Sequence, residues 1–393
     1  MLHIVEPTLS DEKGHCYSFA RSLCVAANGD PITLWAARGA RLPAMPPGVE
    51  VRPHFHRRFR RLQAPLLYRR LLGQEGRILV ETAERNDLLF LDWAAGGRRI
   101  PPAKVFLYFH WYKERPGKRR MLARVARRQP DLVLFGPTPT VVEVFRACGF
   151  PWVELVPYPI SQAASGPASA PSALPGPAPA TAPHPALQPP AAPEAAPRFR
   201  RILFAGAARQ DKGFGAFVDL VLHLAAAGAE TPVAVQANLD RPDGYDEATR
   251  RDLARLRAAA YAPLEALPDP LPADAYAASY AGGICVQPYH ARKFADRVSG
   301  VTLDALTAGC PLVAVEGTWS ARMVERFGAG RVVPDTRPET LLAAVRAIEA
   351  GYEGYAAAAR RGGLVLLEEN DARRLYAAIA AATPGGGAPT SSA

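Results

Sequence analysis

The chain has 393 residues, of which 49% are hydrophobic and 21% charged, a composition that predicts a globular protein with room for two domains. It has no apolar run of about 18 residues, so we expect no transmembrane helix. The net charge is +10, and residues 1–160 hold the excess, with 25 Lys and Arg against 14 Asp and Glu. A basic half favours an anionic partner such as a membrane surface, a phosphorylated lipid or nucleic acid; the alternative is a solvated, arginine-rich surface.

The five cysteines form no CxxC pair, and we expect reduced structural thiols. The start, MLHIVEPTLSDEKGH, lacks the basic and apolar regions of a signal peptide. Both observations favour a cytoplasmic location, and the basic first half adds peripheral binding at the inner membrane face as an option. The cysteines are Cys16, Cys24, Cys148, Cys285 and Cys310.

Short apolar segments alternate with amphipathic segments in the first half. They predict strands over 2–5, 32–37, 88–92, 104–110 and 131–136, with helical segments between them, the first over 17–28. Residues 161–198 are rich in proline and alanine and cannot bury a core, so we expect a disordered or extended linker there. This linker divides the chain into domains over 1–160 and 199–365.

The second half repeats the pattern, with strands expected over 201–206, 231–237, 283–289, 311–315 and 331–334. Helices are expected over 214–228, 246–260, 300–309, 319–327 and 338–350, and a last helix over 366–382 precedes a disordered tail, 383–393. Alternating strands and helices predict an α/β fold with parallel sheets and right-handed crossovers. We therefore expect two Rossmann-like domains facing a cleft, with ligands at the carboxyl ends of the strands.

The loop after residues 201–206 has the composition of a phosphate site. Gly206 lets a ligand approach the backbone, and Arg209 and Lys212 supply a planar fork and a compact point charge for phosphate oxygens. The alternative is an ordinary strand–helix loop with surface cations.

Two carboxylates with seven residues between them, Asp296 and Asp304, flank a predicted helix start. Ser299 is a suitable N-cap, and the backbone of Ser299 and Gly300 offers free N–H groups at the positive end of the helix dipole. Asp304 lies one turn inside, where it can accept hydrogen bonds from ribose hydroxyls. The alternative is a capped loop with a solvated aspartate.

Candidates elsewhere are weaker. His110 ends a predicted strand and can hydrogen bond a sugar hydroxyl, although a lone histidine is often structural. Gly14, in the first loop after a strand, allows close approach of a substrate, and Glu6 ends the first strand. Tyr261 lies in a loop that can flank a nucleotide base.

Several signatures are missing. The sequence has no GxGxxG after its first strand and no GxxxxGK[ST], which argues against a nicotinamide dehydrogenase and a P-loop enzyme. No HExxH motif or Cys/His cluster indicates zinc, so we expect no metal site. A nucleic-acid-binding protein is suggested only by the basic charge, without aromatic interleaving or a motif.

The second half resembles the donor domain of the GT-B glycosyltransferases, especially the retaining glycosyltransferase family 4 (group 1). The resemblance covers roughly residues 200–335. It consists of Gly206, Arg209, Lys212 and a following glycine, two acidic residues separated by seven, and a helix that ends in Ala-Gly-Cys-Pro-Leu-Val. Both acidic positions are Asp here, where the family has Glu. The first half matches by layout, by the Gly14 loop and by His110.

The resemblance implies transfer of a sugar from a nucleotide-diphosphate donor, with retention at the anomeric carbon and without a metal or cofactor. Arg209 and Lys212 would neutralise the diphosphate, and the Ser299–Gly300 backbone would hold it. Asp304 would bind ribose, Asp296 the donor sugar, and His110 the sugar from the N-terminal, acceptor-binding domain. The helix over 366–382 would cross back to that domain.

The acceptor is predicted from charge and fold analogy as a glycan or a lipid-linked glycan, in bacterial surface polysaccharide synthesis. The donor nucleotide, UDP or GDP, is left open. Two rivals remain: a sugar-nucleotide 2-epimerase of the same fold, and a non-catalytic glycosyltransferase-like scaffold or sugar-nucleotide-binding protein, which the two Asp replacements keep open.

Overall fold

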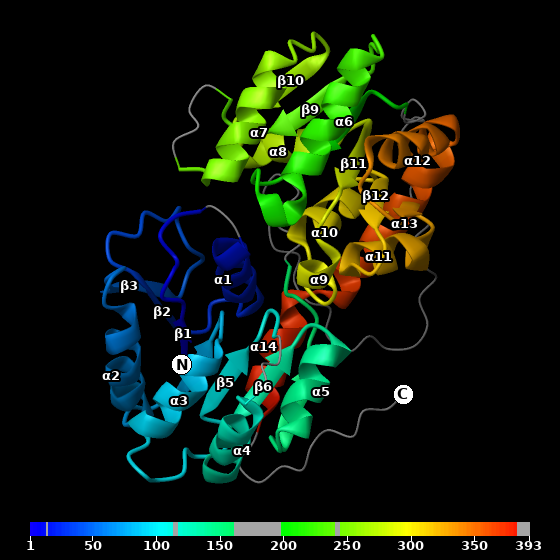
Figure 1. Cartoon of the computed structure of the whole chain (residues 1–393). Coiled ribbons are helices and arrows are strands. Elements are labelled where there is room, and N and C mark those ends of the chain that lie inside the picture. Colours follow the sequence, from blue (N-terminus) through cyan, green and yellow to red (C-terminus); the bar gives the residue numbers. More distant parts are fainter. Residues whose placement is uncertain (13–14, 113–116, 161–197, 240–243, 383–393) are drawn as a thin grey trace, which may run out of the picture.

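The computed structural model describes residues 1–12, 15–112, 117–160, 198–239 and 244–382. Its strands form two separate sheets, one in each of two lobes (Figure 1), and the prediction of two parallel-sheet α/β domains is confirmed. The predicted linker (except Arg198), the tail and Gly14 lie outside the described residues. Within the described ranges, no helix is both long and apolar enough to cross a membrane.

The first lobe holds a seven-stranded sheet in the order β3-β2-β1-β4-β5-β6-β7. All neighbouring strands pair in parallel. Its strands are β1 (Leu2–Val5), β2 (Ile32–Ala37), β3 (Val49–Phe55), β4 (Arg77–Val80), β5 (Val105–Tyr108), β6 (Val133–Gly136) and β7 (Trp152–Leu155). The helices between them are α1 (His15–Ala26), α2 (Arg60–Leu72), α3 (Arg85–Ala94), α4 (Arg119–Arg128) and α5 (Pro139–Ala147).

The second lobe holds a six-stranded parallel sheet in the order β10-β9-β8-β11-β12-β13. Its strands are β8 (Arg201–Phe204), β9 (Val233–Gln236), β10 (Leu264–Leu267), β11 (Gly283–Gln287), β12 (Leu312–Val315) and β13 (Gly330–Val333). Its helices are η2 (Gln210–Lys212, 3₁₀), α6 (Phe214–Ala226), α7 (Glu247–Ala258), α8 (Ala273–Ser279), α9 (Ala291–Phe294), α10 (Gly300–Thr307), α11 (Trp319–Phe327), α12 (Pro338–Ala350) and α13 (Tyr352–Glu369).

In each sheet the chain winds outward from the central strands, first toward one edge and then toward the other. The chain runs from β1 to one edge, returns to β4 and then runs to the other edge, and β8 and β11 play the same parts in the second lobe. The crossover helices on the two sides of the centre therefore cover opposite faces: α1 packs on one face of the first sheet and α2 to α5 on the other. This reversal leaves a gap at the carboxyl ends of the two central strands. We call these two places the first and the second switch point.

The strand predicted over 88–92 is wrong, because this segment lies inside helix α3. Its buried residues, Leu88, Leu91 and Ala94, recur every three positions, which is a helical and not a strand spacing. The true strand is β4, whose four residues RILV were too short a signal beside the longer apolar run that follows.

Three further strands that the sequence pattern did not indicate, β3, β7 and β10, all lie at the edges of their sheets. Each is only partly buried, in contrast with β1, β5 and β6, which are buried throughout. An edge strand lacks one neighbour, so its side chains do not form the continuous apolar run that marks a central parallel strand.

The predicted helix over 366–382 is two helices, α13 and α14 (Ala372–Ala381). The break falls at Asp371, whose carboxylate accepts a hydrogen bond from the backbone of Arg373 and begins α14. Helix α14, red in Figure 1, packs against the first lobe: Leu375 and Ile379 are buried in the core beside α1, and Arg77 donates to the carbonyl of Ala382 at 2.9 Å.

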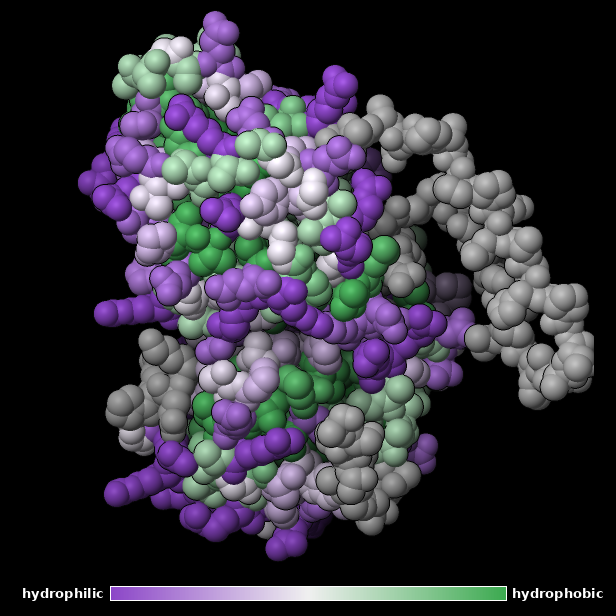
Figure 2. Space-filling view, turned by 90° about the vertical axis from the view of Figure 1, so that its right-hand side faces the viewer, coloured by the Kyte–Doolittle hydropathy of each residue, from purple (hydrophilic) through white to green (hydrophobic). Residues whose placement is uncertain are grey.

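The carboxyl edges of the two sheets face each other. Thr140, at the start of α5 in the first lobe, donates a 3.2 Å hydrogen bond to Asp296, which follows β11 in the second. The Arg297 guanidinium lies over the ring of Trp111, which follows β5, at 5.9 Å. On the face seen in Figure 2, small hydrophobic patches are separated by hydrophilic side chains.

Candidate functional site

The loop after β8 turns at Gly206, whose φ of +78° is in the left-handed region. Its amide donates a 2.6 Å hydrogen bond to Gln236 Oε1, which fixes the turn. A Cβ at this position would lie 2.7 Å from Lys212 Nζ and 2.9 Å from a methyl group of Val301. Glycine therefore allows the Lys212 ammonium and the start of α10 to approach the loop backbone closely.

Lys212 is partly buried beside this turn. Burial, and repulsion from Arg209 and Arg297, lower the pKa of its ammonium to about 8, although Asp211 acts in the opposite direction. Within the described part of the chain, no side chain or carbonyl accepts a hydrogen bond from this ammonium. A cation withdrawn from water without a partner favours an anionic ligand.

Two arginines extend the positive charge around Lys212. Arg209 donates from Nε to Asp211 at 2.8 Å, and its second bond to the same carboxylate completes a fork. Arg297 Nη1 lies 3.9 Å from Asp211 and stacks over the ring of Phe294 at 5.2 Å. One carboxylate thus orients two guanidinium groups, and the three cations leave the cluster with a net positive charge.

Helix α10 begins beside the cation cluster. Ser299 is buried and caps the helix by accepting from the amide of Thr302. The Thr302 hydroxyl donates 2.8 Å to Gln287 Oε1, which ties the helix start to the end of β11. Gly300 is exposed, and a Cβ there would meet nothing within 4 Å. The first N–H groups of the helix have no intrahelical partner and are available to an anion.

Asp304 lies one turn inside α10 and accepts a 3.0 Å hydrogen bond from the hydroxyl of Tyr276, which itself accepts from Tyr280. One side of Asp304 is open to solvent, but protein atoms surround the rest. Burial raises the pKa of its carboxyl to about 6, although the bond from Tyr276 and the charge of Lys212 favour the ionised form. Asp304 and Lys212 thus lie close enough to interact electrostatically.

Asp296 lies between the lobes. Its Oδ1 accepts from Arg322 of α11 at 3.2 Å and from Thr140 of the first lobe at 3.2 Å. This carboxylate is therefore engaged in holding α5 near α11.

His110 follows β5 in the first lobe and is partly exposed. Its Nε2 lies 3.1 Å from the carbonyl oxygen of Glu81 and 3.5 Å from the hydroxyl of Thr82. The ring also packs against Phe19 and Tyr158. These contacts fix the imidazole at the carboxyl edge of the first sheet.

The structure does not bring Tyr261, which the sequence suggested as a base-binding residue, to the cation cluster. Tyr261 precedes β10 and donates 2.7 Å to the carbonyl of Thr231, which precedes β9. Since the strands are parallel, these positions are at the amino edge of the sheet, opposite the cation cluster. The ring is buried in the core, which the loop-like sequence around it did not indicate.

Sequence reasoning also missed Tyr276 and Gln236, which orient Asp304 and the Gly206 loop. Each lies about 30 residues from its partner along the chain, and only the pairing of strands in the sheet brings them together.

No family model matches this sequence, and no curated protein matches it. Solved structures do match over nearly the whole chain. Sucrose-phosphate synthase from Thermosynechococcus elongatus aligns with a TM-score of 0.64 at 12% identity, over 97% of both chains. HepE of Anabaena, in complex with UDP and glucose, aligns with a TM-score of 0.60 at 11% identity, over 97% of this chain and 98% of that one. WaaG, a glycosyltransferase involved in lipopolysaccharide biosynthesis, aligns with a TM-score of 0.61 at 13% identity, over 98% of this chain and all (100%) of that one. The predicted GT-B fold is thereby confirmed.

Gly213→Ala is expected to unfold the second lobe. Gly213 has a φ of +71°, and a Cβ would lie 1.9 Å from the carbonyl oxygen of Pro288, so the backbone must move. The left-handed conformation alone costs alanine about 1–2 kcal/mol, and the clash adds to it. We expect a fall of the melting temperature by several degrees or loss of soluble protein.

Gly354→Ala is the matched control, because a Cβ there meets nothing within 4 Å inside helix α13. Alanine is favoured over glycine in a helix by about 1 kcal/mol, so this variant should be as stable as the parent or more so. Equal melting temperatures for the two variants would contradict the tight turn at Gly213.

Proposed function

We propose that the chain is a retaining, metal-independent glycosyltransferase that moves a sugar from a nucleotide-diphosphate donor to a glycan or lipid-linked acceptor. The observation that carries the proposal is the meeting of Arg209, Lys212 and Arg297 with the start of α10 at the second switch point. A diphosphate matches this arrangement, because it carries two adjacent negative groups and many acceptor oxygens. HepE, which shares the fold, has been solved with UDP-glucose.

The cations and the helix start also supply what the reaction needs. Breaking the bond between the sugar and the diphosphate places additional negative charge on the leaving phosphate. Arg209, Lys212 and the N–H groups of α10 stabilise that charge electrostatically, from positions fixed by Asp211, Gly206 and Gln287. Retention at the anomeric carbon rests on the resemblance to family 4.

The remaining residues would bind the ribose and the transferred sugar, at the two ends of the donor. Asp304, oriented by Tyr276, accepts hydrogen bonds from the ribose hydroxyls. His110 reaches the transferred sugar from the first lobe. Asp296 binds that sugar only after exchanging its bond to Arg322 or Thr140.

The engaged state of Asp296 favours a second candidate function, a non-catalytic scaffold or sugar-nucleotide-binding protein. In that case Asp296 only holds the lobes together, and the donor is bound without being consumed. Donor binding without release of nucleoside diphosphate in the presence of any glycan or lipid-linked acceptor would favour this alternative.

A screen of UDP-, GDP-, ADP- and CMP-linked sugars by thermal shift tests the donor site. A ligand at about 100 times its Kd stabilises the folded state by about 2.7 kcal/mol, so one nucleotide class should raise the melting temperature clearly, with or without EDTA. Arg209→Ala should weaken that ligand about tenfold or more, because it removes charged hydrogen bonds to phosphate.

Arg52→Ala is the matched control for this screen. Arg52 also forks onto a carboxylate two residues away, Glu50, but on an edge strand of the first lobe. The Arg52→Ala variant should bind the donor with the affinity of the parent protein. A donor effect that is equal in all three proteins, or no stabilisation by any sugar nucleotide, would contradict the proposed function.

The pKa of Lys212 gives the donor affinity a definite pH dependence. Only the protonated ammonium attracts phosphate, so the affinity should fall as the pH rises through about 8. Lys212→Met should bind weakly and without this decline, whereas Lys293→Met, at an exposed lysine on α9, should keep it. Calorimetry with UDP and GDP across this pH range measures the effect; an unchanged decline in Lys212→Met would contradict the assignment.

Helix α2, at the outer edge of the first lobe in Figure 1, supports a lipid-linked acceptor. Phe59, Leu62 and Leu66 are spaced three and four residues apart on one face, and each is more than half exposed. Arginines flank this stripe: Arg57, Arg58, Arg60, Arg61, Arg69 and Arg70. An apolar stripe bordered by cations is typical of a helix that lies on an anionic membrane surface.

Leu62→Ser with Leu66→Ser should reduce binding to vesicles that contain anionic lipid. Each leucine contributes apolar area that enters the interface, and the arginines alone give a weaker, salt-sensitive attraction. Leu364→Ser is the control, because Leu364 lies on a different helix, α13, with nearly the same exposed fraction: 63% against 67% for Leu62. Co-sedimentation with anionic and neutral vesicles at low salt decides; equal binding to both vesicle types would contradict the membrane partner.

A further inference from the structure

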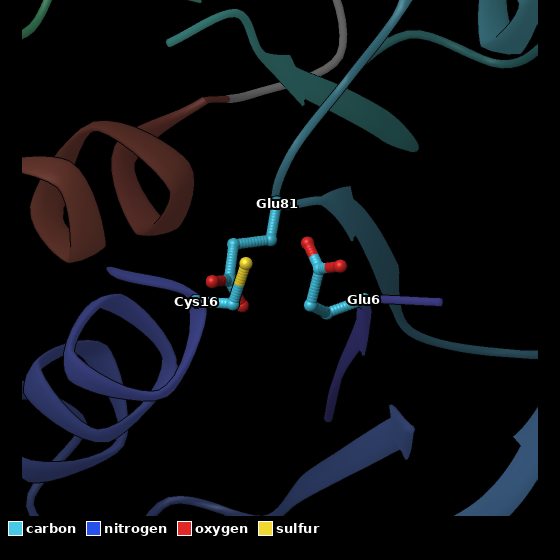
Figure 3. A group of neighbouring side chains, drawn as sticks. All are labelled: Glu6, Cys16 and Glu81. Atoms are coloured by element: carbon cyan, nitrogen blue, oxygen red, sulfur yellow. The ribbon is translucent and has the colours of Figure 1, made fainter. Parts of the chain in front are cut away.

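Two glutamates lie at the first switch point. Glu6 and Glu81 come directly after β1 and β4, whose last residues, Val5 and Val80, are register partners. The two carboxylates therefore leave neighbouring strands at the same edge of the sheet. Cys16, in the first turn of α1, joins them (Figure 3).

Both carboxylates are fully buried, with 0% of either residue exposed. Oε1 of Glu6 accepts from the backbone and hydroxyl of Thr8. Oε2 of Glu6 and both oxygens of Glu81 have no hydrogen-bond partner among the described residues. A buried carboxylate oxygen that accepts no hydrogen bond is stable only if the group takes up a proton or binds a cation. One oxygen of each glutamate lies within 4.8 Å of the other and of Cys16 Sγ.

We propose that Glu6, Cys16 and Glu81 bind a zinc ion. One ligand atom from each residue lies within 4.8 Å of the others, which is compact enough for three ligands to close on one metal. A thiolate beside two carboxylates favours Zn²⁺ over Mg²⁺ or Ca²⁺, which take oxygen ligands alone. Three protein ligands leave the fourth position of a tetrahedral site to water.

Burial and mutual repulsion within the group shift the pKa values of Glu81 and Cys16. Burial, and then the charge of Glu6, raise the pKa of Glu81 well above its usual range. Burial, followed by Glu6 and Glu81, raises the pKa of the Cys16 thiol to about 12, although hydrogen bonds with Thr8 and Thr82 act in the opposite direction. A divalent cation reverses both effects, because it stabilises the deprotonated ligands and displaces their protons.

A chain of polar contacts connects the group to His110. Cys16 Sγ lies 3.8 Å from the Thr82 hydroxyl, which lies 3.5 Å from His110 Nε2. Cys16 is partly exposed, whereas Glu6 and Glu81 are fully buried. Zinc bound here would fix the start of α1 against the strand ends beside His110, in the lobe opposite the cation cluster.

The test uses the tag-free, full-length protein after dialysis against a chelator. Calorimetric titration with Zn²⁺ alone should give one site per chain. Titration with Co²⁺ should give a near-ultraviolet thiolate-to-cobalt charge-transfer band, which reports the sulfur ligand directly. Cys16→Ser should abolish the band, and Glu81→Gln should weaken metal binding at least about tenfold.

Cys24→Ser is the matched control, because Cys24 is a buried cysteine on the same helix that lies outside the group. It should keep both the zinc site and the cobalt band. Circular dichroism of each variant verifies folding, and Glu81→Gln preserves the shape of the side chain if Cys16→Ser fails to fold. No stoichiometric zinc binding by the parent protein, or a cobalt band that survives Cys16→Ser, would overturn the proposal. Neither result depends on the donor, so the zinc site and the proposed function fail separately.

Discussion

The winding of each parallel sheet is the constraint on which the rest of the structure depends. Because the chain leaves the centre of each sheet in opposite directions, the strand ends at the switch point are not covered by a crossover connection. Strand ends and helix starts expose backbone groups there, and side chains from several loops converge. In the second lobe this brings Gly206, Lys212 and the start of α10 within contact distance, although Gly206 and Val301 are almost 100 residues apart in the chain.

The two switch points have opposite charge. The second carries three cations around Asp211, whereas the first carries Glu6 and Glu81 with no cation bonded to their unpartnered oxygens among the described residues. Burial disfavours the charged form of both groups: it lowers the pKa of Lys212 and raises that of Glu81. The proposed anion site and the proposed cation site thus lie at equivalent positions of two similar lobes.

The sequence was sufficient for the fold and for most of the second switch point, because both depend on local patterns. Buried central strands are continuous apolar runs, and Gly206, Arg209 and Lys212 lie within seven residues of one another. The strands β3, β4, β7 and β10 were not predicted because they are short or only partly buried, and the loop around Tyr261 gives no sign of which sheet edge it joins. Glu81 was not identified as a site residue for a related reason. Because β4 was not predicted, the sequence did not show that Glu81 lies beside Glu6 at the same sheet edge.

The contacts between the lobes include residues of the proposed donor site, Asp296 and Arg297. Asp296 is shared between Arg322 and Thr140 through one oxygen, and Arg297, its neighbour, touches both Asp211 and Trp111. The hydrogen bond to Thr140 is between exposed groups, so its rupture costs little, and the aromatic contact at 5.9 Å is weak as well. A diphosphate that drew Arg297 toward itself would alter its contact with the first lobe at the same time. In the proposed function, donor binding would therefore be linked to lobe position through these two adjacent residues, and contacts that water can replace would set the strength of that link.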